Sequence, residues 1–338
     1  MKFLIIRLSS IGDIVLTTPV VRCLKKQLPD VELHYLVKPS YKEVIANNPY
    51  ITKLHLLQEN WDQMIRELRE ERYDYVIDLH RNFRSFRIKN NLKVPAFSFK
   101  KLNFHKLVFT KLKWNVMPRQ EHVIDRYFKT VELFGVYNDG GGMDYFITHE
   151  DEVNQNDIPT SHQAGYIGIV IGASFYTKKL PVYKLQELCS KIDHPIILLG
   201  GPEDASAGEE IKKVDSVKVY NACGKFTLNE SADLVRKAKL IISHDTGLMH
   251  IAAALKKPVI AVWGSTTPAL GMYPYYGVNF LSLQSSLPYD DMQVHKLWCR
   301  PCTKIGRTKC PQGHFKCLKK MSIDEIVLRA NERLGRLS

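Results

Sequence analysis

Two aspartates follow apolar runs at points where a strand is expected to pass into a helix, which is where open α/β sheets place reactive groups. The first is Asp13, in the segment Ser9-Ser10-Ile11-Gly12-Asp13 after the apolar start of the chain. A carboxylate in the first helical turn stays ionised because the helix dipole favours negative charge, so it suits a general base. A carboxylate that only caps the helix would give the same pattern, and the residues alone leave both interpretations open.

The second aspartate follows the apolar run 240–244 and precedes the helical residues 251–254. Backbone N–H groups at the start of such a helix point outward and bind phosphate. We therefore expect an anion-binding loop formed by Asp245, Thr246, Gly247, Leu248 and His250. A plain crossover turn would look the same, and the histidine also fits a residue that only packs.

Two more strand ends in this half carry polar groups. Ala173 and Ser174 follow one strand and precede Lys178, and a lysine there can meet a pyrophosphate. Glu203 follows the next strand, where an acidic group can accept hydrogen bonds from ribose hydroxyls. Each signal is weak alone, but together they predict an anion cradle and several polar loops at the carboxyl ends of one sheet.

The usual dinucleotide fingerprint and the usual acidic metal-binding pair are both missing from the sequence. The first turn lacks Gly-x-Gly-x-x-Gly, and Asp-x-Asp occurs nowhere in the chain. Asp-x-Asp is the usual way to hold a metal ion on a sugar nucleotide. If such a ligand binds here, we expect its leaving diphosphate to be neutralised by lysine and helix N–H groups, with no cofactor and no catalytic metal.

The seven cysteines are an odd number, and three of them are scattered as expected for reduced thiols. The other four gather near the C-terminal end around His314; they are Cys299, Cys302, Cys310 and Cys317. Four thiolates are enough for a tetrahedral structural zinc site. Their spacing is irregular for a known zinc ribbon, so free thiols or a packed cysteine knot stay open as alternatives.

These residues need elements to position them, and the sequence alternates apolar runs with amphipathic segments. Strands are expected at 2–7, 31–37, 53–57, 74–79, 166–172, 195–200, 217–221, 240–244 and 258–263. Helices are expected at 14–28, 41–46, 60–71, 182–192, 204–213, 228–238 and 247–256. The glycine-rich and then polar stretch from 140 to about 165 is typical of a linker.

This alternation predicts an α/β protein of two Rossmann-like domains whose parallel sheets face a cleft. A length of 338 residues suits two domains. We expect the first domain at 1–155 and the second at 165–320. A last amphipathic helix within 321–338 is expected to be able to pack back on the first domain.

The net charge of +13 is concentrated in two stretches. Residues 81–120 hold eleven Lys or Arg and residues 296–320 hold eight, with no Asp or Glu in either. Such stretches favour an anionic partner, either an acidic substrate, a phospholipid surface or nucleic acid, although a basic surface can also serve solubility alone. No nucleic-acid-binding motif is recognisable, so we expect no nucleic-acid partner. No apolar run is long enough to span a bilayer, and the start of the chain fits a strand better than a signal peptide, so we expect a cytoplasmic protein.

Taken jointly, these segments resemble the bacterial heptosyltransferases of glycosyltransferase family 9. The resemblance rests on 9–13, Leu16-Thr17-Thr18-Pro19, Lys178-x-Leu180-Pro181, Gly200-Gly201 and 245–253, in this order along nearly the whole chain. It implies a GT-B fold and an inverting, metal-independent transfer of heptose from ADP-L-glycero-D-manno-heptose to the anionic inner core of lipopolysaccharide. It also implies a protein peripherally associated with the cytoplasmic surface of the inner membrane.

The resemblance also implies roles for single residues. Asp13 matches the family's proposed base, and Lys178 matches a lysine that contacts the donor phosphate. Arg81 and Arg84 lie in a stretch similar to the family's acceptor side. The implied donor-binding residues are Ser10, Gly12, Ala173, Ser174, Lys178, Glu203, Asp245, Thr246, Gly247, Leu248 and His250.

Two positions depart from the family pattern. The family often has Trp where Leu180 stands and a hydroxyl where Ala173 stands, so donor contacts can differ. One alternative is a related transferase with another nucleotide sugar or acceptor. An alternative of a different class is a basic nucleic-acid-binding protein, whose affinity would fall log-linearly with salt concentration.

Overall fold

The structure, a computed structural model, describes residues 1–118, 121–282 and 288–335, which divide into two compact units. Unit 1 contains 1–101, 121–146 and 277–280. Unit 2 contains 147–276 and the described parts of 102–120 and 281–338. Segment 102–118, which we had assigned to the first domain, therefore belongs to unit 2.

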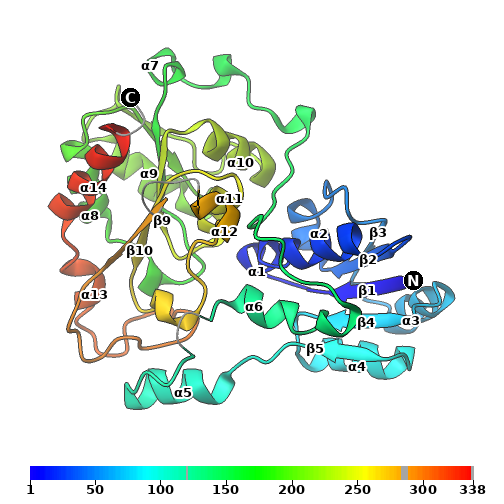
Figure 1. Cartoon of the computed structure of the whole chain (residues 1–338). Helices are drawn as coiled ribbons and strands as arrows, with labels where there is room; N and C mark the ends of the chain where they lie inside the picture. Colours follow the sequence, from blue (N-terminus) through cyan, green and yellow to red (C-terminus); the bar gives the residue numbers. More distant parts are fainter. Residues whose placement is uncertain (119–120, 283–287, 336–338) are drawn as a thin grey trace. The chain divides into compact units, whose positions relative to one another are not determined.

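Unit 1 is built on a parallel sheet of five strands in the order β3-β2-β1-β4-β5 (Figure 1). The strands are β1 (Lys2–Ile6), β2 (Glu32–Val37), β3 (Lys53–Leu56), β4 (Tyr75–Asp78) and β5 (Ala96–Ser98). Chain order reverses between β1 and β4, which are neighbours in the sheet. In doubly wound sheets, ligands bind at the carboxyl ends of the strands on either side of such a reversal.

Short helices connect these strands, and one more, α6, follows the last of them. They are α1 (Ile11–Val15), α2 (Thr18–Gln27), α3 (Trp61–Glu70), α4 (Phe83–Leu92) and α6 (Val123–Phe128), with a 3₁₀ turn at Pro39–Val44. Helix α3 shows why the sequence folds this way: Met64, Ile65 and Leu68 recur at helical spacing and are buried in the core of unit 1. Asn60 caps this helix, because its side chain accepts a hydrogen bond from Gln63 N at 3.1 Å.

The beginning of the expected linker is fixed inside unit 1. Arg22 of α2 is buried, and its guanidinium donates to the carboxylates of Asp139 and Asp144 and to Gly142 O. A buried guanidinium needs such partners, since leaving it unpaired would be costly. Residues 139–144 are therefore part of the packed unit, and the chain passes into unit 2 after Phe146.

Unit 2 is built on a parallel sheet of six strands in the order β11-β10-β9-β6-β7-β8. The strands are β6 (Ile167–Val170), β7 (Ile196–Leu199), β8 (Val219–Asn221), β9 (Leu240–His244), β10 (Val259–Trp263) and β11 (Tyr289–Gln293). Here the chain order reverses between β6 and β9. Every residue of β6, β7, β9 and β10 is buried, as expected for parallel strands covered on both faces.

The helices of unit 2 are α5 (Asn103–Leu112), α7 (Thr160–Gln163), α8 (Val182–Lys191), α9 (Ala205–Lys212), α10 (Leu228–Lys237), α11 (Gly247–Ala254), α13 (Lys316–Lys319) and α14 (Ile323–Gly335). Helix α12 (Val278–Leu281) ends where the chain re-enters unit 2. Pro181 precedes α8, where its missing N–H costs nothing. The α/β class with two parallel sheets is confirmed.

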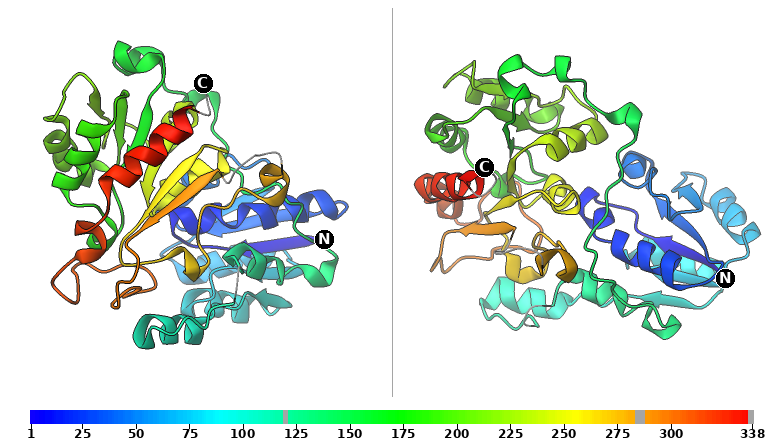
Figure 2. Two further views of the ribbon diagram at one scale, coloured as in Figure 1. Left: turned by 60° about the vertical axis from the view of Figure 1, so that its left-hand side comes forward. Right: turned by 45° about the horizontal axis from the view of Figure 1, so that its top comes forward.

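The last helix packs on unit 2, contrary to the expectation that it could return to the first domain. Helix α14 lies along α8 and also contacts β9 and β10 (Figures 1 and 2). Its apolar face, formed by Ile323, Ile326 and Ala330, belongs to the core cluster of unit 2. Within the described residues, none of the helices is both long and apolar enough to cross a membrane.

Candidate active site

The reversal point of unit 2 is occupied by an ion pair between two of the expected site residues. Lys178 ends a 3₁₀ turn after β6, and Asp245 directly follows β9, the neighbouring strand. Lys178 Nζ lies 2.7 Å from Asp245 Oδ2 and donates to Asp245 O at 3.0 Å. Both side chains are 13% exposed. The pair thus lies where an anionic ligand would bind, with the lysine held in place by the aspartate.

The loop after Asp245 has the form expected of a phosphate site. Thr246 precedes the eight-residue helix α11, which begins at Gly247, and residues 245–248 are half-buried. The first N–H groups of a helix have no partner within that helix, so they are available to an anion. His250 is buried, with 2% of its surface exposed, which agrees with a packing role for its ring.

Two residues that we had not singled out hold this arrangement together. Thr266, three residues beyond the end of β10 at Trp263, donates from its hydroxyl to Asp245 Oδ2 at 2.8 Å. His244 accepts a hydrogen bond at Nε2 from the Leu180 N–H at 2.9 Å. Burial lowers the pKa of His244 to about 4, so the ring is neutral and can accept this bond. Both residues follow the rule used for the predicted ones, since they lie at the carboxyl ends of neighbouring strands.

The next loop of the same edge is held by a second ion pair. Lys179 Nζ lies 2.6 Å from Asp204 Oδ1, and Asp204 is buried between the loops that follow β6 and β7. A side chain at Gly172 would collide with this carboxylate, because an added Cβ would lie 2.3 Å from Asp204 Oδ2. Glu203 and Ser174 are exposed, and Ala173 is half-buried. Asp204 therefore has a structural role here, whereas Glu203 stays available to a ligand.

The reversal point of unit 1 carries Asp13. It lies in α1 after β1, and its Oδ1 is 2.6 Å from Arg7 Nη2. Its Oδ2 accepts from Ser10 Oγ at 2.9 Å, and 25% of the side chain is exposed. Burial raises the pKa of Asp13, but the Arg7 charge and the Ser10 hydrogen bonds outweigh it and hold the pKa below its usual value of 3.8. The carboxylate is ionised and reachable from solvent, while Gly12 beside it is buried.

The expected acceptor residues follow the adjacent strand β4. Arg81 and Arg84 are exposed, and Arg81 Nη1 donates to Phe99 O at 2.9 Å. Arg81 adopts a positive φ of 49°, held by its N–H, which donates to Asp78 Oδ1 at 2.7 Å. Strands β1 and β4 are parallel neighbours in the sheet. Asp13 follows β1 and the two arginines follow β4, so all three residues lie at the same edge of the sheet of unit 1.

His80, at this edge of unit 1, is a further residue that sequence reasoning did not single out. Burial lowers its pKa to about 4, so the imidazole is neutral near pH 7. Its Nδ1 atom is buried and has no hydrogen-bond partner within residues 1–118, 121–282 and 288–335. A buried polar atom without a partner is uncommon, and it is a candidate contact for a ligand hydroxyl.

Comparisons with known proteins identify the family to which this chain belongs. Residues 61–293 match glycosyltransferase family 9 (heptosyltransferase), which is more than half of the chain and includes Lys178 and Asp245 but not Asp13. The chain belongs to glycosyltransferase family 9. This glycosyltransferase is 28% identical to lipopolysaccharide heptosyltransferase 1 of Campylobacter coli over 290 positions, covering 79% of the chain and 84% of that protein.

Two further similarities extend over almost the whole glycosyltransferase. It is 27% identical to lipooligosaccharide heptosyltransferase 2 of Haemophilus ducreyi over 364 aligned positions, covering 99% of the chain and all of that protein. The solved structure of E. coli ADP-heptose LPS heptosyltransferase II covers 99% of each chain with a TM-score of 0.72 and 18% identity. The latter likeness shows the GT-B fold, which confirms the fold class expected from the sequence.

The zinc prediction for the four cysteines of this glycosyltransferase gains no support from the structure. Cys299, Cys302, Cys310 and Cys317 are free thiols, and Cys299 Sγ lies 3.7 Å from His314 Nε2. Among the described residues, their sulfur atoms do not form a group of three or more potential ligands within 4.8 Å of one another. The cysteine site therefore stays a prediction.

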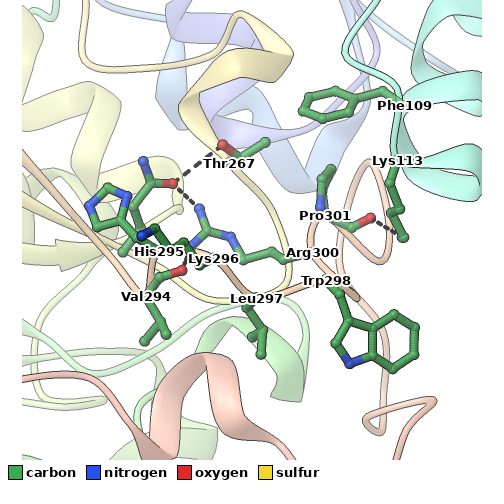
Figure 3. Close-up of a pocket in the computed structure, with 11 residues that line it drawn as sticks. Phe109, Lys113, Thr267, Val294, His295, Lys296, Leu297, Trp298, Arg300 and Pro301 are labelled. Atoms are coloured by element: carbon green, nitrogen blue, oxygen red, sulfur yellow. Dashed lines mark hydrogen bonds between the residues drawn. The ribbon is translucent and has the colours of Figure 1, made fainter.

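A pocket of about 430 Å³ lies within unit 2 beside the Asp245 loop (Figure 3). Arg300 donates from Nε to Thr266 O at 3.2 Å, which connects the pocket to the threonine that binds Asp245. Lys113 of the segment after α5 donates to Pro301 O at 2.8 Å on the other side. The lining includes Lys113, His295, Lys296 and Arg300, so the pocket favours an anionic occupant.

Proposed function

We propose that this glycosyltransferase transfers a heptose from ADP-L-glycero-D-manno-heptose to the inner core of lipopolysaccharide, with inversion at the anomeric carbon and without a catalytic metal. The Lys178–Asp245 pair at the reversal point of unit 2 carries the donor half of this proposal. The choice of sugar and acceptor is supported by the relatives, which are named as heptosyltransferases of lipopolysaccharide or lipooligosaccharide.

In the proposed reaction, unit 2 binds the nucleotide sugar and unit 1 binds the acceptor. Lys178 and the N–H groups at the start of α11 neutralise the diphosphate as it leaves. Asp13 accepts the proton of the acceptor hydroxyl that attacks the sugar, and Arg81 and Arg84 bind acidic groups of the core. The absence of Asp-x-Asp from the sequence supports metal independence, because that pair is the usual metal holder for sugar nucleotides.

Thermal denaturation in the presence of nucleotides tests the donor assignment. With ADP, UDP, GDP and ADP-heptose compared in the presence of a chelator, we expect ADP and ADP-heptose to raise Tm selectively. A ligand that binds only the folded protein at 100 times its Kd stabilises it by about 2.7 kcal/mol. A selective rise with UDP or GDP would leave the fold intact and overturn the heptose proposal, and a rise that needs divalent metal would overturn metal independence.

We also propose that α5 carries the peripheral contact with the inner membrane. Phe109 is buried in a cluster with Met117 and Leu270 of unit 2, which anchors the helix. Phe104 and Trp114 are 72% and 68% exposed, in a stretch without a single acidic residue. Exposed aromatic residues flanked by lysines are typical of helices that lie in the interface of an anionic bilayer.

Vesicle sedimentation tests this contact. The double variant Phe104→Ser/Trp114→Ser is expected to lose most of its binding to anionic phosphatidylglycerol vesicles, because the aromatic side chains would no longer enter the interface. Leu133→Ser is the matched control, since Leu133 is 77% exposed on unit 1. Equal binding of the double variant and the control would show that α5 does not touch the lipid.

A further inference from the structure

Four polar side chains meet in unit 1 at a place that the proposed reaction does not use. They come from separate segments: His34 from β2, His55 from β3, Glu71 from the end of α3, and Tyr73 from the loop before β4. In the sheet register, His34 pairs with Lys53 and Leu36 pairs with His55, so the two histidines lie on one face of neighbouring strands. His34 is the third residue of β2, toward the end of the sheet opposite to Asp13.

The polar atoms of these side chains converge on one point. His34 Nδ1 lies 3.2 Å from His55 Nε2, and Tyr73 Oη lies 3.0 Å from each of them. The Glu71 carboxylate is 3.7 Å from the same His34 atom and 3.9 Å from the same His55 atom. His34 and Tyr73 are almost fully buried, and the side chains of His55 and Glu71 are only 11% and 15% exposed.

The triangle holds more close contacts than hydrogen bonds. A neutral imidazole nitrogen either carries a proton and donates, or carries a lone pair and accepts. One imidazole N–H donating to Tyr73 Oη and the Tyr73 hydroxyl donating to the other imidazole satisfy all three groups, so the 3.2 Å contact between the two nitrogens is a further close approach. A cation at the centre would use the lone pairs of all three atoms and would account for all three contacts.

The distances fit a metal ion. Two nitrogen or oxygen ligands at about 2.0–2.1 Å from a tetrahedral Zn²⁺ lie about 3.3 Å apart, close to the separations found here. Within the described residues, His34, His55 and Glu71 form the one group whose potential His, Cys, Asp or Glu ligand atoms all lie within 4.8 Å of one another.

The far side of the His34 ring faces a carboxylate. Nε2 lies 3.9 Å from Glu32 Oε2, beyond hydrogen-bond distance, and Glu32 pairs with Lys2 at 3.0 Å. The other ring nitrogen, Nδ1, faces the convergence point.

Two lysines pair with Glu71 and would compete with a metal ion for its carboxylate. Lys2 Nζ is 3.3 Å from Glu71 Oε2, and Lys53 Nζ forms a short ion pair with Glu71 Oε1. Their ammonium groups repel a cation and compete for the carboxylate. The Lys53 side chain is 56% exposed, so it can turn into solvent and release Glu71.

We propose that His34, His55 and Glu71 bind one divalent transition-metal ion of the zinc class, with the Tyr73 hydroxyl at the fourth position. The ion fixes the edge strand β3 and the end of α3 to β2. It is a structural ion in unit 1, and this proposal stands independently of the proposed transferase reaction.

Titration of the metal-depleted full-length protein with Co²⁺ tests the site. In a background that also carries Cys302→Ser and Cys310→Ser, so that the predicted cysteine site cannot hold the ion, we expect one Co²⁺ per chain and the intense visible d–d bands of a four-coordinate ion, without a sulfur-to-cobalt charge-transfer band. Zn²⁺ should displace the signal and raise Tm. No binding, or a spectrum dominated by thiolate charge transfer, would overturn the proposal.

Two variants locate the binding. His55→Gln is expected to abolish the Co²⁺ spectrum, whereas His149→Gln, which alters a fully solvated histidine with 96% side-chain exposure, should leave it unchanged. Retention of the spectrum in His55→Gln would move the metal elsewhere. If His55→Gln does not fold, Lys53→Ala decides, because it keeps all four ligands and removes a competing cation. That variant should bind Co²⁺ several-fold more tightly, and unchanged or weaker binding would contradict the site.

Discussion

Replacing Asp13 by Asn is expected to lower kcat by about 10²–10⁴-fold, the usual contribution of a general base. The amide keeps the size of the side chain and can still accept a hydrogen bond from Ser10, but it cannot take up a proton. Because the aspartate is proposed to act on the acceptor, the rise in Tm caused by ADP should stay close to that of the wild type. Turnover of donor and acceptor, measured beside the thermal shift, separates the two effects.

The control for this variant is Asp62→Asn. Asp62 is also an aspartate in the first turn of a helix, but it is exposed on α3. Arg7 is buried against Asp13, so the melting temperature of the Asn variant must be checked for loss of this pair. Turnover near the wild-type level in folded Asp13→Asn protein would assign proton removal to another group.

The pH dependence of the wild type follows from the same contacts. A base works only when deprotonated, and the pKa of Asp13 lies below 3.8. Loss of activity from its protonation should therefore begin only below about pH 4, so the rate should be flat from there to neutrality as far as this group is concerned. An acidic limb near pH 6 that disappears in Asp13→Asn would show that bound substrate raises the pKa of the carboxyl group.

Most of the sheet structure could be predicted because the central strands of both sheets are buried on two faces and read as apolar runs. The exceptions are edge strands. Strand β5 has only three residues, and β11 has the polar sequence Tyr-Asp-Asp-Met-Gln. The carboxylate of Asp291 in β11 is satisfied by the indole N–H of Trp263 at 2.7 Å, a long-range contact that no local pattern reveals.

The helix expected at 14–28 is interrupted for a local reason. Thr17 and Thr18 donate from their hydroxyls to Ile14 O and Val15 O at 2.7 and 2.8 Å, which ends α1. Pro19 then occupies the first turn of α2, where a proline is tolerated. The Thr-Thr-Pro segment marks this break in the sequence, so the expectation of one continuous helix at 14–28 was wrong.

The candidate site was predictable at the level of loops but only partly at the level of residues. The rule that ligands gather at the carboxyl ends of parallel strands located both edges. It could not tell that Lys178 pairs with Asp245 while Lys179 pairs with Asp204, because this depends on where the turn after β6 ends. The His34 cluster was missed altogether, because its members are spread over 40 residues and meet only through the register of β2 and β3.

Replacing Lys178 by Ala is expected to reduce the rate by about 10²–10³-fold, as for other preorganised groups that stabilise charge developing in a transition state. The ion pair gives this loss a second cause. Without the lysine, the Asp245 carboxylate stays at the reversal point of unit 2, because Thr266 still donates to it, but it has lost the cation with which it was paired. That carboxylate would repel the donor diphosphate, so the thermal shift caused by ADP should also shrink.

The neighbouring lysine provides a matched control. Lys179→Ala also breaks a lysine–aspartate pair on the same loop, but its partner Asp204 is buried between loops. We therefore expect Lys179→Ala to lower Tm while the rate per folded molecule changes little. A second substitution, Asp245→Asn, should restore part of the ADP binding of Lys178→Ala, because it removes the unpaired charge. Equal rate losses for the two lysine variants would show that the loop acts only as a whole, and an unchanged rate in Lys178→Ala would make the pair structural.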